Sequence, residues 1–248
     1  MGFLVIDDVS YSYKDAENIL RNIDLKIEQK EIHCLVGRSG CGKTTLLKLA
    51  SGLLAPARGN IYMKDSKVLK PSSEVGFVFQ APTLLEWKSV LDNILLPISL
   101  KRKITEADRA RAVHLLEMMG LESYGDYYPT ELSGGQQSRI AIARALIKKP
   151  SMLFLDEPFA ALDAITREEL QDDLVKLCQM EDISVLFITH DLAEAIYLGD
   201  RVSVMERGEI VHRLDVPLER PRIGELRYDP VFNELCLKVK SVMSGESS

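Results

Sequence analysis

Runs and alternations of apolar residues predict several strands in the first third of the chain. A period of 3.6 residues begins after Gly42 and predicts a helix that ends at Gly52. The strands expected before and after this helix are Phe3–Ile6, Ile23–Ile27, Ile32–Val36, Asn60–Met63 and Val75–Phe79. The chain therefore opens with mostly extended structure interrupted by one helix.

The pattern becomes helical in the middle of the chain and then alternates between strands and helices. Between residues 89 and 149 the predicted helices are Ser89–Ile98, Glu106–Met119 and Gln136–Lys148. After them, strands are expected at Met152–Leu155, Ser184–Ile188 and Val202–Met205, with helices at Ile165–Met180 and Leu192–Leu198. Such alternation predicts an α/β fold with a mainly parallel sheet core and an inserted helical subdomain. The tail, 214–248, is punctuated by prolines and offers one weak helix around Val231–Val239.

Composition narrows the class of protein. The 248 residues are 46% hydrophobic, enough for a substantial core, and no apolar run approaches the ~18 residues needed to span a bilayer. The first ten residues lack the basic start of a secretory signal. A net charge of −6 disfavours nucleic acid as a partner, and the short basic run Lys101–Lys103 is more typical of a solvated face than of a binding site. The four cysteines contain no CxxC pair, which argues against zinc or a disulfide framework and fits a reducing cytoplasm.

A complete phosphate-binding pattern lies between the predicted strand Ile32–Val36 and the helix that follows it. Its residues are Gly37, Arg38, Ser39, Gly40, Cys41, Gly42, Lys43 and Thr44. The glycines let successive backbone N–H groups point inward at an anion, and the helix start adds its positive end. Lys43 is expected to reach the β- and γ-phosphates of a nucleotide, and the Thr44 hydroxyl to bind Mg²⁺.

A pair of carboxylates follows the apolar strand Met152–Leu155. Carboxyl ends of parallel strands are where α/β sheets bind ligands, so Asp156 is expected to hold Mg²⁺, through water. Glu157 is expected to orient and polarise the attacking water. Alone, such a pair is more often a helix cap or a turn; beside a phosphate loop, the hydrolytic interpretation is favoured.

A second turn could also bind an anion. Ser133, Gly134, Gly135 and Gln136 open a predicted helix, where a serine can cap and two glycines expose N–H groups. Spacing alone favours a plain helix cap here.

These motifs together resemble the ATP-binding subunit of ABC transporters over essentially the whole chain. Leu132–Gln136 matches that family's signature, and it accompanies the phosphate loop and the run Leu155–Pro158 in family order. The resemblance implies a P-loop NTPase of the ABC ATPase type, with an antiparallel N-terminal β part. It also implies ATP and Mg²⁺ as ligands and ATP hydrolysis coupled to transport. The domain expected is 1–248, with a core at 1–88 and 150–213, a helical subdomain at 89–149 and a tail at 214–248.

The resemblance assigns further residues to the site. Tyr13 matches the aromatic that stacks on adenine, Gln80 the glutamine that contacts Mg²⁺ and water, and His190 the switch histidine. Thr45 follows the phosphate loop, and Asp163 belongs to the family's D-loop. Ordinary structural roles remain open for Tyr13, Gln80 and His190.

The family's arrangement implies partners. Two copies close head to tail over two ATP molecules, so that Ser133–Gln136 and Asp163 of one copy face the phosphate loop of the other. Transmembrane permease subunits, and an extracytoplasmic solute-binding protein for an importer, are also expected, which puts this subunit on the cytoplasmic face of the membrane. The alternatives are an ABC importer or exporter ATPase for another solute, a soluble ABC ATPase that acts on DNA or ribosomes, and a cassette that binds ATP without hydrolysis.

The run Leu84–Trp87 and the tail around Pro217–Arg222 resemble the nitrate, sulfonate and taurine importer branch, although Glu86 and Glu219-Arg220 depart from its pattern. Trp87 could contact the permease or be buried in the helical subdomain. Lys30 stands where the family usually turns with glycine, and Ser138 replaces a frequent glutamine.

Overall fold

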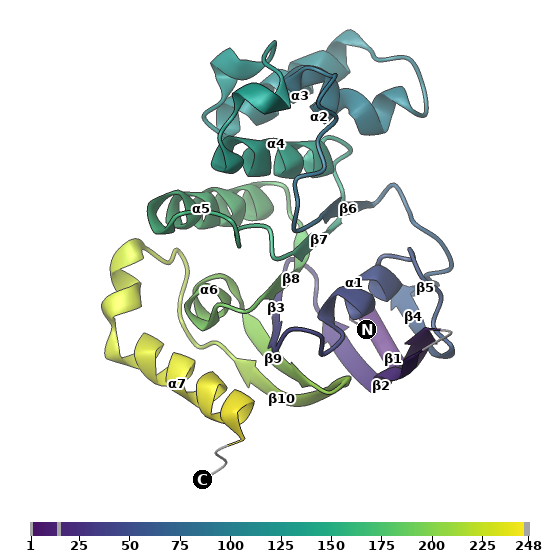
Figure 1. The fold of residues 1–248 in the computed structure, drawn as a ribbon, viewed down its shortest axis with the longest axis vertical. Coiled ribbons are helices and arrows are strands. Elements are labelled where there is room, and N and C mark those ends of the chain that lie inside the picture. The colour runs from purple at the N-terminus through teal and green to yellow at the C-terminus, as the bar shows by residue number, and fades with distance from the viewer. Residues whose placement is uncertain (1, 14–15, 246–248) are drawn as a thin grey trace. The chain divides into compact units, whose positions relative to one another are not determined.

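The chain folds into two compact units. The structure is a computed structural model that describes residues 2–13 and 16–245. One unit, here called the terminal unit, comprises Met1–Ser72 and Asp182–Ser248, and the other, the central unit, comprises Ser73–Glu181. Figure 1 labels the elements of both.

An antiparallel sheet forms the N-terminal part of the terminal unit. Its strand order is β2-β1-β4-β5, from Ala16–Ile27, Leu4–Tyr13, Arg58–Met63 and Ser66–Lys67. Register shifts interrupt β1 beyond Ile6, and Asp8 has a φ of 47°. These irregularities break the alternation of apolar residues, which is why the sequence predicts only the first residues of β1. The antiparallel N-terminal β part is confirmed.

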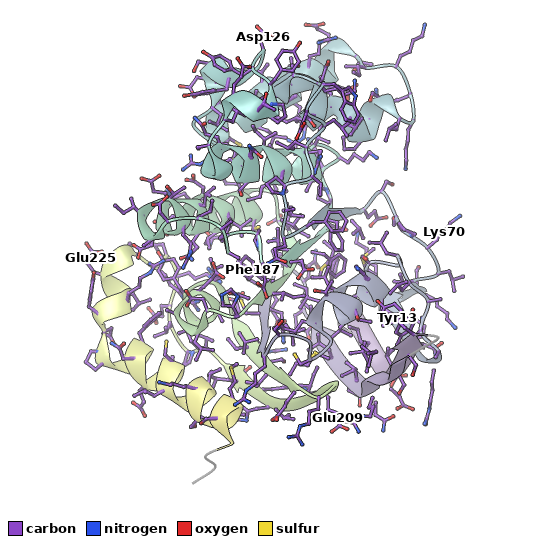
Figure 2. All side chains as sticks on the ribbon, in the orientation of Figure 1. Tyr13, Lys70, Asp126, Phe187, Glu209 and Glu225 are labelled. Carbon is purple, nitrogen blue, oxygen red and sulfur yellow. The ribbon has the colours of Figure 1, made fainter. Side chains whose placement is uncertain are left out.

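Parallel strands form the buried centre of the terminal unit. β3 (Ile32–Gly37) pairs in parallel with β8 (Ser184–Thr189) and with β9 (Arg201–Glu206), and β10 (Glu209–Asp215) lies antiparallel to β9. Every residue of β3 and β8 is buried, which explains their continuous apolar runs. Phe187, labelled in Figure 2, is one of these fully buried residues.

Three helices complete the terminal unit. α1 (Lys43–Ala50) follows β3, and α6 (Leu192–Leu198) follows β8. α7 (Pro230–Ser244) packs against α6 and β9 (Figure 1). Asp229 caps α7 and Pro230 occupies its first turn, so the weak helix predicted in the tail exists and is longer than expected.

The central unit is mainly helical. β6 (Val75–Val78) and β7 (Met152–Asp156) form a parallel pair. α2 (Val90–Ser99) and α3 (Glu106–Met118) contact α4 (Gly134–Leu146), which also contacts α5 (Ala164–Met180). Short 3₁₀ turns lie at Glu122–Tyr124 and Pro129–Glu131. The predicted helices are therefore confirmed as elements; the subdomain boundaries at 89 and 149 stay a prediction, because the compact unit also contains β6, β7 and α5.

Both positions that depart from the pattern noted in the sequence lie among the described residues. Lys30 adopts a φ of 64°, the left-handed conformation that glycine takes most readily. Its N–H donates to Ser184 Oγ at 2.8 Å, and its ammonium lies 2.7 Å from Asp182 Oδ1. Ser138 is buried within α4, a position that a small side chain fits.

Candidate functional site

The phosphate loop of the terminal unit is shaped by two kinds of glycine. A Cβ on Gly37 would lie 2.2 Å from the backbone oxygen of Met205 in β9, so only glycine fits that packing. Gly40 and Gly42 have φ angles of 79° and 108°, and a Cβ on Gly40 would meet nothing within 4 Å. The loop therefore turns sharply against β9 and leaves its middle open, as an anion cradle requires.

Lys43 is held by the loop that it follows. Its ammonium is buried and donates to Gly37 O at 2.8 Å and to Arg38 O at 3.1 Å. Gly42 provides no side-chain cap at the start of α1, whereas a Ser, Thr or Asp side chain caps each of the other α-helices among the described residues. Gly42 thus supplies no side-chain oxygen to the first N–H groups of α1, and the positive end of this helix suits a phosphate oxygen.

The remaining residues of the loop divide by exposure. Arg38, Ser39 and Thr44 are exposed, while Cys41 and Thr45 are buried. Burial raises the pKa of the Cys41 thiol, which keeps it protonated at neutral pH. Cys41 therefore serves the loop through packing and backbone contacts, and its carbonyl accepts from Gly208 N at 3.1 Å.

Two other predicted residues belong to the terminal unit. Tyr13 lies at the end of β1, 42% exposed, with its ring edge-to-face to Tyr11 at 5.0 Å (Figure 2). His190 is exposed directly after β8. Next to it, Asp191 caps α6 by accepting from Glu194 N at 3.2 Å, which fixes the backbone at this strand end.

The two carboxylates lie in the central unit at the end of β7. Asp156 is the last residue of the strand and is 8% exposed. Glu157 has a φ of 46°, a conformation that costs a non-glycine residue roughly 1–3 kcal/mol and that clusters at functional sites. The chain therefore turns sharply directly after Asp156, at the carboxyl end of the strand.

The signature turn of the central unit is a reciprocal cap. Ser133 Oγ accepts from Gln136 N at 3.3 Å, and Gln136 Oε1 accepts from Ser133 N at 2.9 Å. A Cβ on Gly135 would lie 2.6 Å from the Thr166 side chain, while Gly134 is exposed. The plain cap expected from spacing is present, and it leaves the backbone at Gly134 open.

Asp163 starts α5. Its carboxylate accepts from Thr166 N at 3.0 Å, and hydrogen bonds from Thr166 hold its pKa below the ordinary value. This cap lies beside the signature turn, because Thr166 also packs against Gly135.

Gln80 is exposed just beyond β6, and the loop after it is held by a residue that the sequence analysis missed. Arg144 of α4 donates to Pro82 O at 2.7 Å and to Thr83 O at 2.9 Å. Arg144 is part-buried, and this burial lowers its pKa. The helix that begins with the signature turn thus fixes the loop after Gln80. A regular apolar helix pattern gave no signal for this role.

The predicted site residues are therefore shared between the two units. The terminal unit carries Tyr13, the phosphate loop with Lys43, Thr44 and Thr45, and His190. The central unit carries Gln80, Ser133, Gly134, Gly135, Gln136, Asp156, Glu157 and Asp163.

Comparisons with known proteins agree on one family. Residues 20–160 match the ABC transporter family. The chain is 41% identical to the nitrate import ATP-binding protein NrtD of Synechococcus elongatus, over 94% of this chain and 89% of that protein. It is 42% identical to the aliphatic sulfonates import ATP-binding protein SsuB of Escherichia coli, over 98% and 92%. The bicarbonate transport ATP-binding protein CmpD of Synechocystis is 39% identical, over 94% and 86%.

Solved structures agree with the sequence relatives. The dimeric ATP-binding cassette MJ0796, in a post-hydrolysis state bound to ADP and phosphate, matches with a TM-score of 0.78 and 31% identity, covering 87% of this chain and all of that one. CbiO1 of Clostridium perfringens, part of an ABC transporter complex, matches with a TM-score of 0.80 and 26% identity, over 99% and 98%. The chain belongs to the ABC transporter family and has the fold of its ATP-binding subunits.

Proposed function

We propose that this chain is the ATP-hydrolysing subunit of an importer for a small oxyanion such as nitrate, a sulfonate, taurine or bicarbonate. The observation that carries the ATPase function is the phosphate loop, with Lys43 held against its carbonyls and an uncapped helix start behind it. The class of solute follows the relatives, which are named for the import of nitrate and sulfonates and the transport of bicarbonate.

Residues of both units would bind the nucleotide and its metal ion. Residues 37–45 bind the phosphates of ATP, and Tyr13 stacks on its adenine. The site would hold Mg²⁺ with the nucleotide, and the ion would supply positive charge against the negative phosphates. Thr44, Gln80 and Asp156 have the oxygen ligands that this ion prefers, and Asp156 acts through water, since Mg²⁺ keeps part of its hydration shell.

Hydrolysis requires a positioned water. Glu157 accepts a proton from the attacking water and orients it, a role that its backbone turn at the end of β7 supports. His190, exposed at the end of β8, contacts the γ-phosphate. Gln80 links this chemistry to the surface loop that Arg144 holds.

A second copy of the chain completes the site. Ser133, Gly134, Gly135 and Gln136 of one copy, with Asp163, face the phosphate loop of the other, so that two ATP molecules lie between the copies. The exposed Gly134 and the dimeric state of MJ0796 support this arrangement. It also gives the second anion-binding turn a use that a single copy does not provide.

The complete system includes membrane partners. The helices of the described residues include none long and apolar enough to cross a membrane. We infer that transmembrane permease subunits provide the path for the solute and that this subunit binds them from the cytoplasmic face. We also propose that an extracytoplasmic binding protein delivers the solute.

Replacing the proposed base tests the function directly. Glu157→Gln keeps the size of the side chain but removes the proton acceptor, so ATP hydrolysis should fall by about a hundredfold or more while ATP binding persists. The variant should also accumulate as an ATP-bound dimer. Phosphate release measures turnover, and size-exclusion chromatography with and without ATP measures the dimer.

Glu122→Gln is the matched control, because Glu122 is exposed on a 3₁₀ turn outside the proposed site. It should hydrolyse ATP at the parental rate. Parental turnover in Glu157→Gln would show that Glu157 is not the base, and a parent that binds no ATP would refute the ATPase function altogether.

A further inference from the structure

A cavity of about 610 Å³ opens between three helices of the central unit, and none of its lining residues belongs to the proposed nucleotide site. Ile98 at the end of α2, Ala107 in α3 and Ile147 after α4 form its apolar wall. Its polar lining is Lys101, Arg102, Asp108, Arg111, Lys148 and Lys149. The short basic run noted in the sequence thus contributes to a concave site as well as to a solvated face.

Two of the cations in this cavity are neutralised by neighbours. Arg102 makes a bidentate pair with Asp108 at 2.6 and 2.8 Å. Arg111 binds Glu181 at 3.1 Å and donates to the last carbonyls of α4, Leu146 O and Ile147 O. Asp108, the one acid among the described residues that line the cavity, is therefore already paired.

Three lysines remain. Within the part of the chain that the structure describes, no carboxylate lies within 4.0 Å of the ammonium of Lys101, Lys148 or Lys149. Burial and the charge of Lys101 lower the pKa of Lys148, because the two ammonium groups repel each other. An anion between them would relieve that repulsion and gain charge-assisted hydrogen bonds.

An ordinary role for lysines at this place is to complement the negative ends of helices. Arg111 already satisfies the end carbonyls of α4, and Lys149 has a φ of 52°, so the chain turns out of the helix there. Lys101 follows α2 and can complement the end of that helix, whereas Arg111 already serves the end of α4. Helix-end complementarity therefore does not account for Lys148 and Lys149, which line the cavity together with Lys101.

We propose that this cavity binds a small molecule that carries a phosphate-type oxyanion on an apolar body. Lys101, Lys148 and Lys149 bind the oxyanion, whose multiple charge matches their excess. Ile98, Ala107 and Ile147 contact the apolar part, because the cavity is much larger than an oxyanion alone.

Phenyl phosphate is a suitable probe, with inorganic phosphate for comparison. Both are titrated into the full chain with its phosphate loop saturated by ADP, and binding is followed by isothermal calorimetry and by amide NMR shifts. We expect phenyl phosphate to bind more tightly than phosphate and to shift the amides of residues 98–111 and 146–149. Shifts confined to residues 37–45 would overturn the proposal.

Charge removal gives the second measurement. Lys101→Gln/Lys148→Gln should weaken phenyl phosphate binding at least about tenfold, since each charge-assisted contact contributes that much. The matched control is Lys103→Gln/Lys70→Gln, which removes two exposed charges that do not line the cavity (Lys70 is labelled in Figure 2). It should change the affinity by less than about twofold.

Lys101→Glu is a third variant. Because Lys101 is exposed, this single substitution should leave the fold intact, so that weaker binding reports the lost charge and not unfolding. Equal affinities for phenyl phosphate in the parent, in Lys101→Gln/Lys148→Gln and in Lys101→Glu would overturn the proposed site.

A phospholipid headgroup carries the same chemistry, so binding to vesicles of phosphatidylglycerol and of phosphatidylcholine is measured as well. If the chain binds phosphatidylglycerol vesicles but not phenyl phosphate, and if this binding depends on the lysines, the oxyanion site is supported and its ligand is a lipid headgroup. Binding to neither phenyl phosphate nor the anionic vesicles would refute the proposal.

Discussion

At the scale of single residues, the phosphate loop depends on glycine for two different physical reasons. Gly37 is fixed by packing, because β9 leaves no space for a Cβ beside the Met205 carbonyl. Gly40 is fixed by conformation, because its φ of 79° is costly for other residues while the space around it is open. One motif therefore contains one glycine that stabilises the sheet and another that shapes the anion cradle.

This distinction predicts different costs for the same substitution. Gly37→Ala should lower the free energy of unfolding by about 3 kcal/mol, because backbone has to move. Gly40→Ala should lower it by only about 1 kcal/mol, from strain at positive φ. Urea unfolding of the nucleotide-free variants measures both, and equal losses would contradict the separation of roles.

Residue roles could be read from the sequence where the chemistry is local. The phosphate loop follows one recognisable strand, and Asp156 and Glu157 stand at the end of another, so the sequence alone predicts roles for them. Arg144 holds a loop 61 residues away from it, and nothing in its own helix indicates that contact. The positive φ of Glu157 was equally hidden, because it follows from how β7 ends.

At the scale of elements, the tail secures the end of α6, the helix that begins after His190. The buried guanidinium of Arg222 donates to Ile196 O at 3.0 Å and to Tyr197 O and Gly199 O at 2.8 Å. Burial lowers its pKa to about 10, so it stays charged at neutral pH. The tail is thus a capping device for a short helix of 7 residues that could not persist alone.

Removing this cap should loosen α6 selectively. Arg222→Met keeps the bulk but leaves buried carbonyls without donors, so the free energy of unfolding should fall by about 2 kcal/mol. Amide exchange in Leu192–Leu198 should accelerate more than in β3 or β8. Hydrogen exchange with mass spectrometry measures this difference between elements.

Arg58→Met is the matched control, because it removes an arginine that caps no helix. Its pair with Asp8 is exposed, at 2.8 Å and with 69% of the arginine side chain accessible, so the cost should stay below about 1 kcal/mol. Uniform exchange across α6 and the strands in Arg222→Met would mean that the tail does not cap this helix.

At the scale of the whole molecule, the sequence predicted the order of strands and helices better than their extent. Buried strands such as β3 and β8 are continuous apolar runs, whereas β10 alternates exposed and half-buried residues at a sheet edge and was missed. Edge strands carry polar residues because one side faces solvent, so periodicity in a short segment cannot separate them from loops. The parallel core was predicted from the alternating order of strands and helices. The antiparallel N-terminal sheet was predicted only from the family resemblance.

The question left open for Trp87 is answered by its exposure. The side chain is 74% exposed, so burial within the helical subdomain is wrong. Asn93 folds the preceding segment by accepting from Leu85 N at 2.8 Å and donating to the carbonyls of Leu85, Lys88 and Ser89 at 3.0 Å each. A fully buried amide thus holds the turn that presents Trp87 outward. An exposed tryptophan on a turn that is held in this way supports contact between Trp87 and a protein partner.

Trp87→Ala should therefore weaken assembly with the proposed permease by about 30-fold, the usual effect of removing an aromatic anchor from an interface. ATP binding by the isolated subunit should stay at the parental level, because Trp87 belongs to no part of the proposed nucleotide site. Tyr228→Ala is the matched control, since Tyr228 is an exposed aromatic of the other unit, with 86% of its surface accessible. Co-purification with the permease, quantified against subunit concentration, measures assembly. If both variants retain the same amount of permease as the parent, Trp87 is not part of the interface, and the membrane partner must bind a different surface.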